Sequence, residues 1–123
     1  QYIRQIVHAV KDLAPTIVFA KGAWASIGAM ADTGAAGLGI DWCIPPKTAR
    51  EFAGNNITLQ GNFDPAKLYA PVDVIRREVK KMITDFGPGR YIANLGHGIL
   101  PTVPVDSARA FVDTVKGFDY STL

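Results

Sequence analysis

The sequence predicts an α/β fold in which one helix precedes four strand–helix units of a parallel sheet. Short apolar runs alternate along the chain with longer segments of helical periodicity, and glycine or proline ends most of them. Strands that alternate with helices are typical of parallel sheets with right-handed crossovers. With 123 residues, 48% hydrophobic and 20% charged, the chain has the composition of one folded domain rather than a disordered segment.

The first helix and the first unit lie in the opening third of the chain. The apolar residues between Tyr2 and Leu13 share one helical face, and Pro15 ends that helix. The β-branched run from Thr16 to Ala20 predicts a strand buried on both faces. The small residues from Ala23 to Thr33 predict a helix that stops at Gly34.

The second and third units repeat this order. The segment Gly37 to Trp42 predicts a weak strand, since its two glycines reduce β-propensity, and Lys47 to Ala53 predicts a short helix. The next strand is expected over Ile57 to Gly61. Apolar residues at spacings of three and four predict a long helix over Val72 to Phe86, ended by Gly87.

The fourth unit closes the chain. Arg90 to Leu95 predicts a strand, and Val105 to Lys116 predicts a helix followed by Gly117.

The carboxyl ends of the strands are the expected location of functional groups, as in parallel α/β folds generally. His97 is the sharpest candidate because it stands between Gly96 and Gly98 just after an apolar strand. Flanking glycines remove side chains that would crowd a ligand. We therefore expect His97 to bind substrate, the alternative being a loop histidine bonded to the backbone.

Four further polar residues near the strand ends are candidates. Asp41 is an acid, a substrate anchor or a buried carboxylate that holds the following loop. Lys21 pairs either with an anionic substrate or with Asp41. Asn62 and Asp64 are placed to contact a ligand, although Asp64 before Pro65 is also typical of a helix start.

Several chemistries are excluded by the sequence. It has no dinucleotide-binding or phosphate-binding glycine loop and no nucleophile elbow. One cysteine, Cys43, excludes a disulfide framework and a multi-cysteine zinc site, indicates a reducing compartment, and is expected to pack rather than to act as a nucleophile. A net charge of +2 and the lack of a long apolar run argue against nucleic-acid and membrane partners.

Four segments, in their order and spacing, resemble the uroporphyrinogen decarboxylase family. They are Phe19-Ala20-Lys21-Gly22, Leu38-Gly39-Ile40-Asp41-Trp42, Thr58-Leu59-Gln60-Gly61-Asn62-Phe63-Asp64-Pro65 and Arg90-Tyr91-Ile92-Ala93-Asn94-Leu95-Gly96-His97-Gly98. The resemblance covers nearly the whole chain and corresponds to the C-terminal part of those enzymes. It implies that residues 1–123 form the C-terminal half of a (β/α)₈ barrel, four βα units preceded by a helix.

The resemblance also implies an activity. The family is a cofactor-free and metal-free carboxy-lyase that converts the four acetate side chains of uroporphyrinogen III to the methyl groups of coproporphyrinogen III in haem biosynthesis. It implies a cytoplasmic homodimer, or a plastid one in a photosynthetic eukaryote. Of the family's principal substrate-site residues only the histidine, matched by His97, falls in this stretch. This chain alone is therefore expected to be inactive and to need the other barrel half, from the parent chain or from another copy.

Two departures and two alternatives accompany this resemblance. Phe63 stands where the family usually has leucine, and Val103-Pro104 replaces the usual Asp-Pro before the last helix. One alternative is a stand-alone or engineered half-barrel without catalysis, whose open edges would pair with a second half. The other is a related cobalamin-type methyltransferase, which is disfavoured because His97-Gly98-Ile99 lacks the His-x-Cys pattern of its zinc-binding members.

Overall fold

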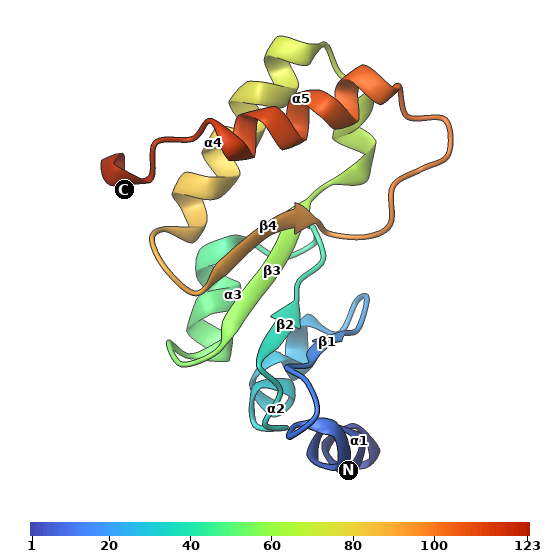
Figure 1. The fold of residues 1–123 in the computed structure, drawn as a ribbon, viewed down its shortest axis with the longest axis vertical. Coiled ribbons are helices and arrows are strands. Elements are labelled where there is room, and N and C mark those ends of the chain that lie inside the picture. The colour runs from blue at the N-terminus through green and yellow to red at the C-terminus, as the bar shows by residue number, and fades with distance from the viewer.

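A computed structural model describes all residues, Gln1–Leu123, as a four-stranded parallel sheet with helices in the connections (Figure 1). The strands are β1 (Ile17–Phe19), β2 (Gly37–Gly39), β3 (Thr58–Phe63) and β4 (Tyr91–Leu95). The helices are α1 (Tyr2–Val10), α2 (Ile27–Ala31), α3 (Pro46–Ala53), α4 (Val72–Phe86) and α5 (Val105–Lys116), with 3₁₀ turns η1 (Trp24–Ser26), η2 (Pro65–Tyr69) and η3 (Tyr120–Thr122). The strands pair in chain order, β1-β2-β3-β4, so the predicted α/β class is confirmed.

The elements differ from the expected ranges mainly at their ends. α1 stops at Val10 because the next residues fold into a turn, in which the amide of Leu13 donates to the carbonyl of Val10 at 2.9 Å. The second predicted helix is a 3₁₀ turn followed by a short α2. β3 continues to Phe63 rather than stopping at Gly61, because its last residues pair with β4 as far as Leu95.

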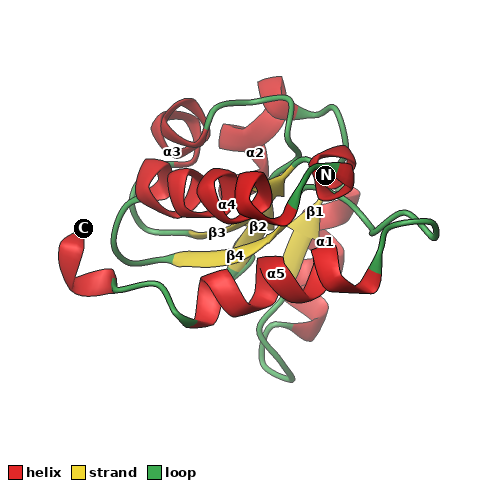
Figure 2. Ribbon diagram, turned by 90° about the horizontal axis from the view of Figure 1, so that it is seen from above, coloured by secondary structure: helices red, strands yellow, loops and turns green.

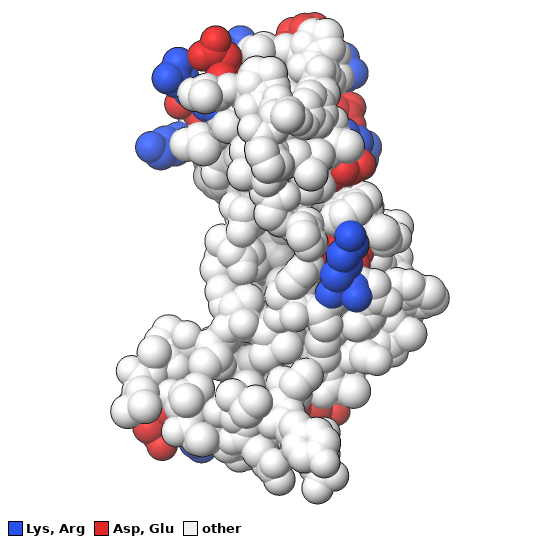
Figure 3. All heavy atoms as spheres, turned by 90° about the vertical axis from the view of Figure 1, so that its right-hand side faces the viewer, with Lys and Arg blue, Asp and Glu red and all other residues white.

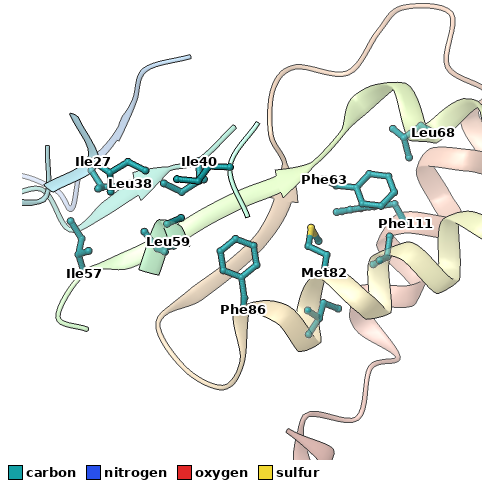
Figure 4. Packing of buried hydrophobic residues seen from close by; sticks show 14 of the residues in the cluster. Ile27, Leu38, Ile40, Ile57, Leu59, Phe63, Leu68, Met82, Phe86 and Phe111 are labelled. Carbon is teal, nitrogen blue, oxygen red and sulfur yellow. The ribbon is translucent and has the colours of Figure 1, made fainter. Parts of the chain in front are cut away.

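The hydrophobic core lies between the sheet and helices α2, α3 and α4, which cover one of its faces (Figure 2). Alternate residues of the strands point into it, and Leu38 and Leu59 are fully buried. Helix α4 contributes Ile75, Val79 and Ile83, which are also fully buried, as its predicted periodicity requires. These side chains belong to one hydrophobic cluster, and Figure 4 shows part of it, with Leu38 and Leu59 from the strands and Met82 and Phe86 from α4. None of the helices has both the length and the apolar composition needed to cross a bilayer.

Aromatic pairs fasten the last two helices to β3 and β4. Phe111 of α5 meets Phe63 edge to face, with ring centroids 5.4 Å apart, and Phe86 of α4 stacks on Tyr91 at 4.1 Å. The Tyr91 hydroxyl donates to the carbonyl of Gly61 at 2.7 Å, and burial raises the pKa of this phenol. α4 and α5 lie side by side at one end of the molecule (Figure 1).

The second face of the sheet carries exposed apolar side chains. Ile17 and Phe19 of β1 are each 46% exposed, and Ile92 of β4 is 42% exposed. The prediction that the first strand is buried on both faces is therefore wrong for this chain. Helices cover only the face to which Val18 and Leu38 contribute, and no helix of residues 1–123 covers Ile17, Phe19 and Ile92 on the other.

Candidate functional site

The carboxyl ends of the four strands meet along one edge of the sheet, because all four strands are parallel and in register. A cleft of about 420 Å³ lies over this edge and continues onto the uncovered face of the sheet. Its lining includes Phe19, Gly39, Gln60, Asn94, His97 and Ile99. It combines apolar surface with a few polar groups, as small-molecule sites commonly do.

His97 projects from the loop after β4 into this cleft and lies between two aromatic rings. Its ring centroid is 6.0 Å from that of Phe19 and 6.3 Å from that of Trp42, and both pairs meet edge to face. The imidazole is exposed and makes no hydrogen bond to the protein, so the expected alternative of a backbone-bonded loop histidine is not what the structure shows. Both ring nitrogens are available to a ligand.

Gly96 sets the position of this histidine. A Cβ on Gly96 would lie 2.7 Å from the backbone nitrogen of Trp42 and 3.1 Å from the carbonyl carbon of Asp41. The amide of Gly96 donates to the carbonyl of Phe63 at 2.7 Å. Only glycine lets the loop after β4 lie this close to the loop after β2, which brings His97 next to Trp42.

Asp41 joins the loops after β1 and β2. Its carboxylate is buried and accepts from the amide of Gly22 at 2.6 Å and from the amide of Cys43 at 2.9 Å. Both oxygens are therefore occupied by backbone donors. Of the three roles expected for Asp41, the geometry is that of a buried carboxylate that holds loops.

Asn62 joins the loop after β2 to β3. Its side-chain nitrogen donates to the carbonyls of Asp41 at 2.9 Å and Ile44 at 2.8 Å, and the residue is buried. Both of its amide donors are thus used inside the protein. The backbone passes this point tightly, since a Cβ on Gly61 would lie 2.4 Å from the carbonyl oxygen of Ile40.

Lys21 and His97 both lie next to the indole ring of Trp42. The ammonium nitrogen of Lys21 is 5.1 Å from the centroid of the Trp42 ring, within the range of a cation–π contact. The expected pairing of Lys21 with Asp41 is not formed: the ion pairs of the structure involve other lysines and arginines, and the Asp41 oxygens accept backbone amides instead.

Comparison with known proteins assigns this arrangement to a family. The family model for uroporphyrinogen decarboxylase (URO-D) matches residues 1–118. The chain belongs to the uroporphyrinogen decarboxylase family. It is 52% identical over 118 residues to uroporphyrinogen decarboxylase of Flavobacterium johnsoniae and 46% identical over 122 residues to that of Homo sapiens, covering 96% and 93% of this chain. It spans 35% and 33% of the lengths of these two relatives, or about a third.

The fold is also found in a solved structure of a different class. A methyltransferase from Methanosarcina mazei superposes with a TM-score of 0.78 and 24% sequence identity, over 93% of this chain and 34% of the methyltransferase. At that identity the likeness shows the fold alone. It fits the expectation that the four βα units form part of a larger barrel.

Two other expectations at the strand ends have clear outcomes. The Asp64 carboxylate accepts from the amide of Ala66 at 2.9 Å and so caps η2, which is the helix-start role expected of aspartate before Pro65. Cys43 is exposed, so the expectation that it packs is wrong. Desolvation and the neighbouring Asp41 carboxylate raise the pKa of its thiol, which disfavours the reactive thiolate.

Three cleft residues were not singled out from the sequence of this decarboxylase-family chain. Phe19, Gln60 and Asn94 point to the uncovered face of the sheet, alongside His97. The sequence of β4 could have indicated Asn94, because side chains alternate between the two faces of a strand. Asn94 shares a face with Ile92, whereas Tyr91 and Leu95 face the core.

Proposed function

We propose that this chain is part of a uroporphyrinogen decarboxylase and forms the C-terminal half of its barrel. The enzyme would remove carbon dioxide from the four acetate side chains of uroporphyrinogen III and yield coproporphyrinogen III. The observation that carries the proposal is the family match over residues 1–118, with 52% identity to the Flavobacterium johnsoniae enzyme. The open cleft with an unpaired histidine at the strand ends supports it.

In the proposed decarboxylation the pyrrole ring itself accepts the electron pair, a task that other decarboxylases give to a cofactor. Protonation of a pyrrole ring carbon makes the ring cationic, and the electron pair of the bond to the departing carboxylate neutralises it as carbon dioxide leaves. A proton then adds to the remaining methylene carbon, which becomes a methyl group, and the ring carbon loses the proton that it gained first, which restores the neutral pyrrole. The protein must place the proton donor, hold the other carboxylates and keep the intermediate away from water.

The residues of this chain serve binding and positioning in that scheme. His97 contacts a substrate carboxylate, as an ion-pair partner when protonated or as a hydrogen-bond donor when neutral. Asp41 and Asn62 are positioning residues, since their polar atoms hold the loops on which Lys21, Trp42 and His97 depend. The remaining groups that the reaction needs lie outside residues 1–123, so the chain alone is inactive.

The uncovered sheet face is where the rest of the barrel belongs in this proposal. Ile17, Phe19 and Ile92 are exposed there, and β1 and β4 each have one unpaired edge. On α1, Tyr2 and Ile6 are 79% and 64% exposed although the helix is strongly amphipathic. Segments of the parent chain or of another copy would cover these surfaces, and the complete enzyme would act as a homodimer.

A chimera tests the proposal. Residues 1–118 replace the matching third of the Flavobacterium johnsoniae enzyme, and conversion of uroporphyrinogen III to coproporphyrinogen III is followed by separating the porphyrins after oxidation. We expect the chimera to be active and the isolated 123-residue chain to be inactive. A folded chimera without decarboxylation, measured beside the active parent enzyme, would refute the assignment.

The role of His97 is tested in the same chimera with a matched histidine. His97→Asn should lower kcat/KM by roughly ten- to a hundredfold, since a hydrogen bond to a charged group contributes about 1.5–3 kcal/mol. His8→Asn is the control, because His8 is an exposed residue of α1 outside the cleft. Equal kinetics of the two variants would show that His97 does not contact the substrate.

A further inference from the structure

Lys21 is a cation without a protein anion although it lies beside a buried carboxylate. The four ion pairs of the structure involve Lys67, Arg77, Lys81 and Arg109, and none involves Lys21. The carboxylate that could neutralise it belongs to Asp41, whose two oxygens already accept backbone amides. The positive charge of Lys21 is therefore left free at the strand ends.

The position of Lys21 is nevertheless well determined. The amide of Gly22 next to it is held by Asp41 at 2.6 Å, and the amide of Ala23 donates to the carbonyl of Ala20, which closes a turn. The ammonium lies 5.1 Å from the centroid of the Trp42 ring. A tethered backbone and an aromatic contact restrict a side chain that would otherwise be highly mobile, and this lowers the entropy cost of binding a ligand.

His97 and Lys21 share the indole of Trp42 as a neighbour. The His97 ring centroid lies 6.3 Å from the Trp42 ring and the Lys21 ammonium 5.1 Å from it. Both side chains are exposed and project from the carboxyl ends of the sheet. The result is two cationic or hydrogen-bond-donating groups on one aromatic support, which suits a ligand with more than one carboxylate.

The surrounding surface makes this charge distinctive. Figure 3 shows the side of the molecule onto which the loops after β1 and β4 project in Figure 1. Charged side chains gather at the α4 and α5 end and are fewer elsewhere, and the middle of the face is mostly uncharged apart from a basic side chain with acidic atoms behind it. A carboxylate that approaches this region meets few competing charges.

We infer that Lys21, supported by Trp42, forms a second carboxylate subsite next to His97, so that the two residues hold two carboxylates of one polycarboxylate ligand. The inference rests on the proposed function for the identity of the ligand, uroporphyrinogen. The presence of the subsite follows from the unpaired charge and its support. Lys21 thus selects substrates by the number and spacing of their carboxylates, while His97 contacts the neighbouring one.

The experiment measures binding and turnover separately in the chimera. Binding of uroporphyrin, the oxidised and fluorescent form of the substrate, is titrated by fluorescence at several salt concentrations. Lys21→Met keeps the apolar stem over Trp42 and should raise the Kd about tenfold, with a weaker salt dependence than the unmutated chimera shows. Lys21→Arg should restore the Kd to within about threefold, and Lys116→Met, a change at an exposed lysine of α5, should leave it unaltered.

The outcomes separate this inference from the proposed function. A decarboxylating chimera in which Lys21→Met binds uroporphyrin like Lys116→Met, with an unchanged salt dependence, would overturn the subsite and leave the function standing. A chimera without decarboxylation in which Lys21→Met still weakens uroporphyrin binding would support the subsite and overturn the function. If Lys21→Arg and Lys21→Met weaken binding equally and lower the unfolding temperature equally, Lys21 is structural and the subsite is refuted.

Discussion

Replacing Asp41 by asparagine should destabilise the protein although the change alters one atom of a side chain. The carboxylate accepts the amides of Gly22 and Cys43 at 2.6 and 2.9 Å, and the residue is 5% exposed. Asparagine keeps one acceptor and turns a donor toward the other amide, so one buried N–H loses its partner. A hydrogen bond to a charged group contributes about 1.5–3 kcal/mol, and we expect Asp41→Asn to lower the free energy of unfolding by about 2 kcal/mol.

The control for this change is the same substitution where a single acceptor suffices. Asp64 caps η2 through one hydrogen bond to Ala66, and asparagine caps a helix about as well as aspartate. Asp64→Asn should therefore change the free energy of unfolding by less than about 0.5 kcal/mol. Urea denaturation of the chimera compares the two variants. A loss for Asp41→Asn no larger than that for Asp64→Asn would refute the assignment of Asp41 as the group that holds the two loops.

Three further changes test other parts of the structure. Arg50→Ala should lower the free energy of unfolding by roughly 2–3 kcal/mol in urea denaturation, since the guanidinium donates to the carbonyls of Gly54, Ile57 and Arg90. The control Arg77→Ala, at an exposed ion pair, should lower it by under about 0.5 kcal/mol. Equal losses would contradict the role of Arg50 in joining these three segments. Gly96→Ala should reduce kcat/KM of the chimera at least about tenfold, because a methyl group forces the loop away from Trp42, and unchanged kinetics would argue against that contact. Cys43, whose thiol pKa is raised, should react with iodoacetamide more slowly at pH 8 in the folded chimera than after denaturation, whereas a faster reaction in the folded state would show an activated thiolate.

The order of elements was predictable because local signals determine it. The last helix was expected over Val105 to Lys116 and has those bounds. The stops at Gly54 and Gly87 hold because each glycine adopts a positive φ, 73° and 74°, which other residues rarely do. The end of β3 was not predictable, since glycine is typical of a strand end, whereas here Gly61, Asn62 and Phe63 continue the pairing with β4.

The exposed face could not be predicted for a different reason. Ile17, Phe19 and Ile92 are apolar, and an apolar strand residue is normally buried. Whether such a residue is covered depends on what packs above it, which the local sequence does not state. Since the chain spans only about a third of its relatives, these residues have the composition of an interior while lying at a surface.

The candidate site divides into residues that are satisfied within the chain and residues that are not, and this division was invisible in the sequence. Asp41, Asn62, Lys21 and His97 all stand near strand ends and all read as polar groups that could meet a ligand. In the structure the Asp41 carboxylate accepts from the amide of Gly22, which is 19 residues away. The Asn62 side chain donates to the carbonyl of Asp41, which is 21 residues away. Partners at that distance along the chain are a property of the folded sheet and leave no sequence signature.

The same division explains how a small set of groups can be both rigid and reactive toward a ligand. Burying a carboxylate or an amide is costly unless its hydrogen bonds are made. Asp41 and Asn62 form theirs with backbone atoms and thereby fix the loops after β1 and β2. Lys21 stays exposed next to Gly22, whose amide Asp41 holds, and His97 stays exposed next to Gly96, which packs against the loop after β2. Both can therefore lack protein partners without a large penalty and keep their donors for a substrate. The unpaired groups are the functional candidates, and the loops that carry them are held by Asp41 for Lys21 and by the close approach of Gly96 for His97.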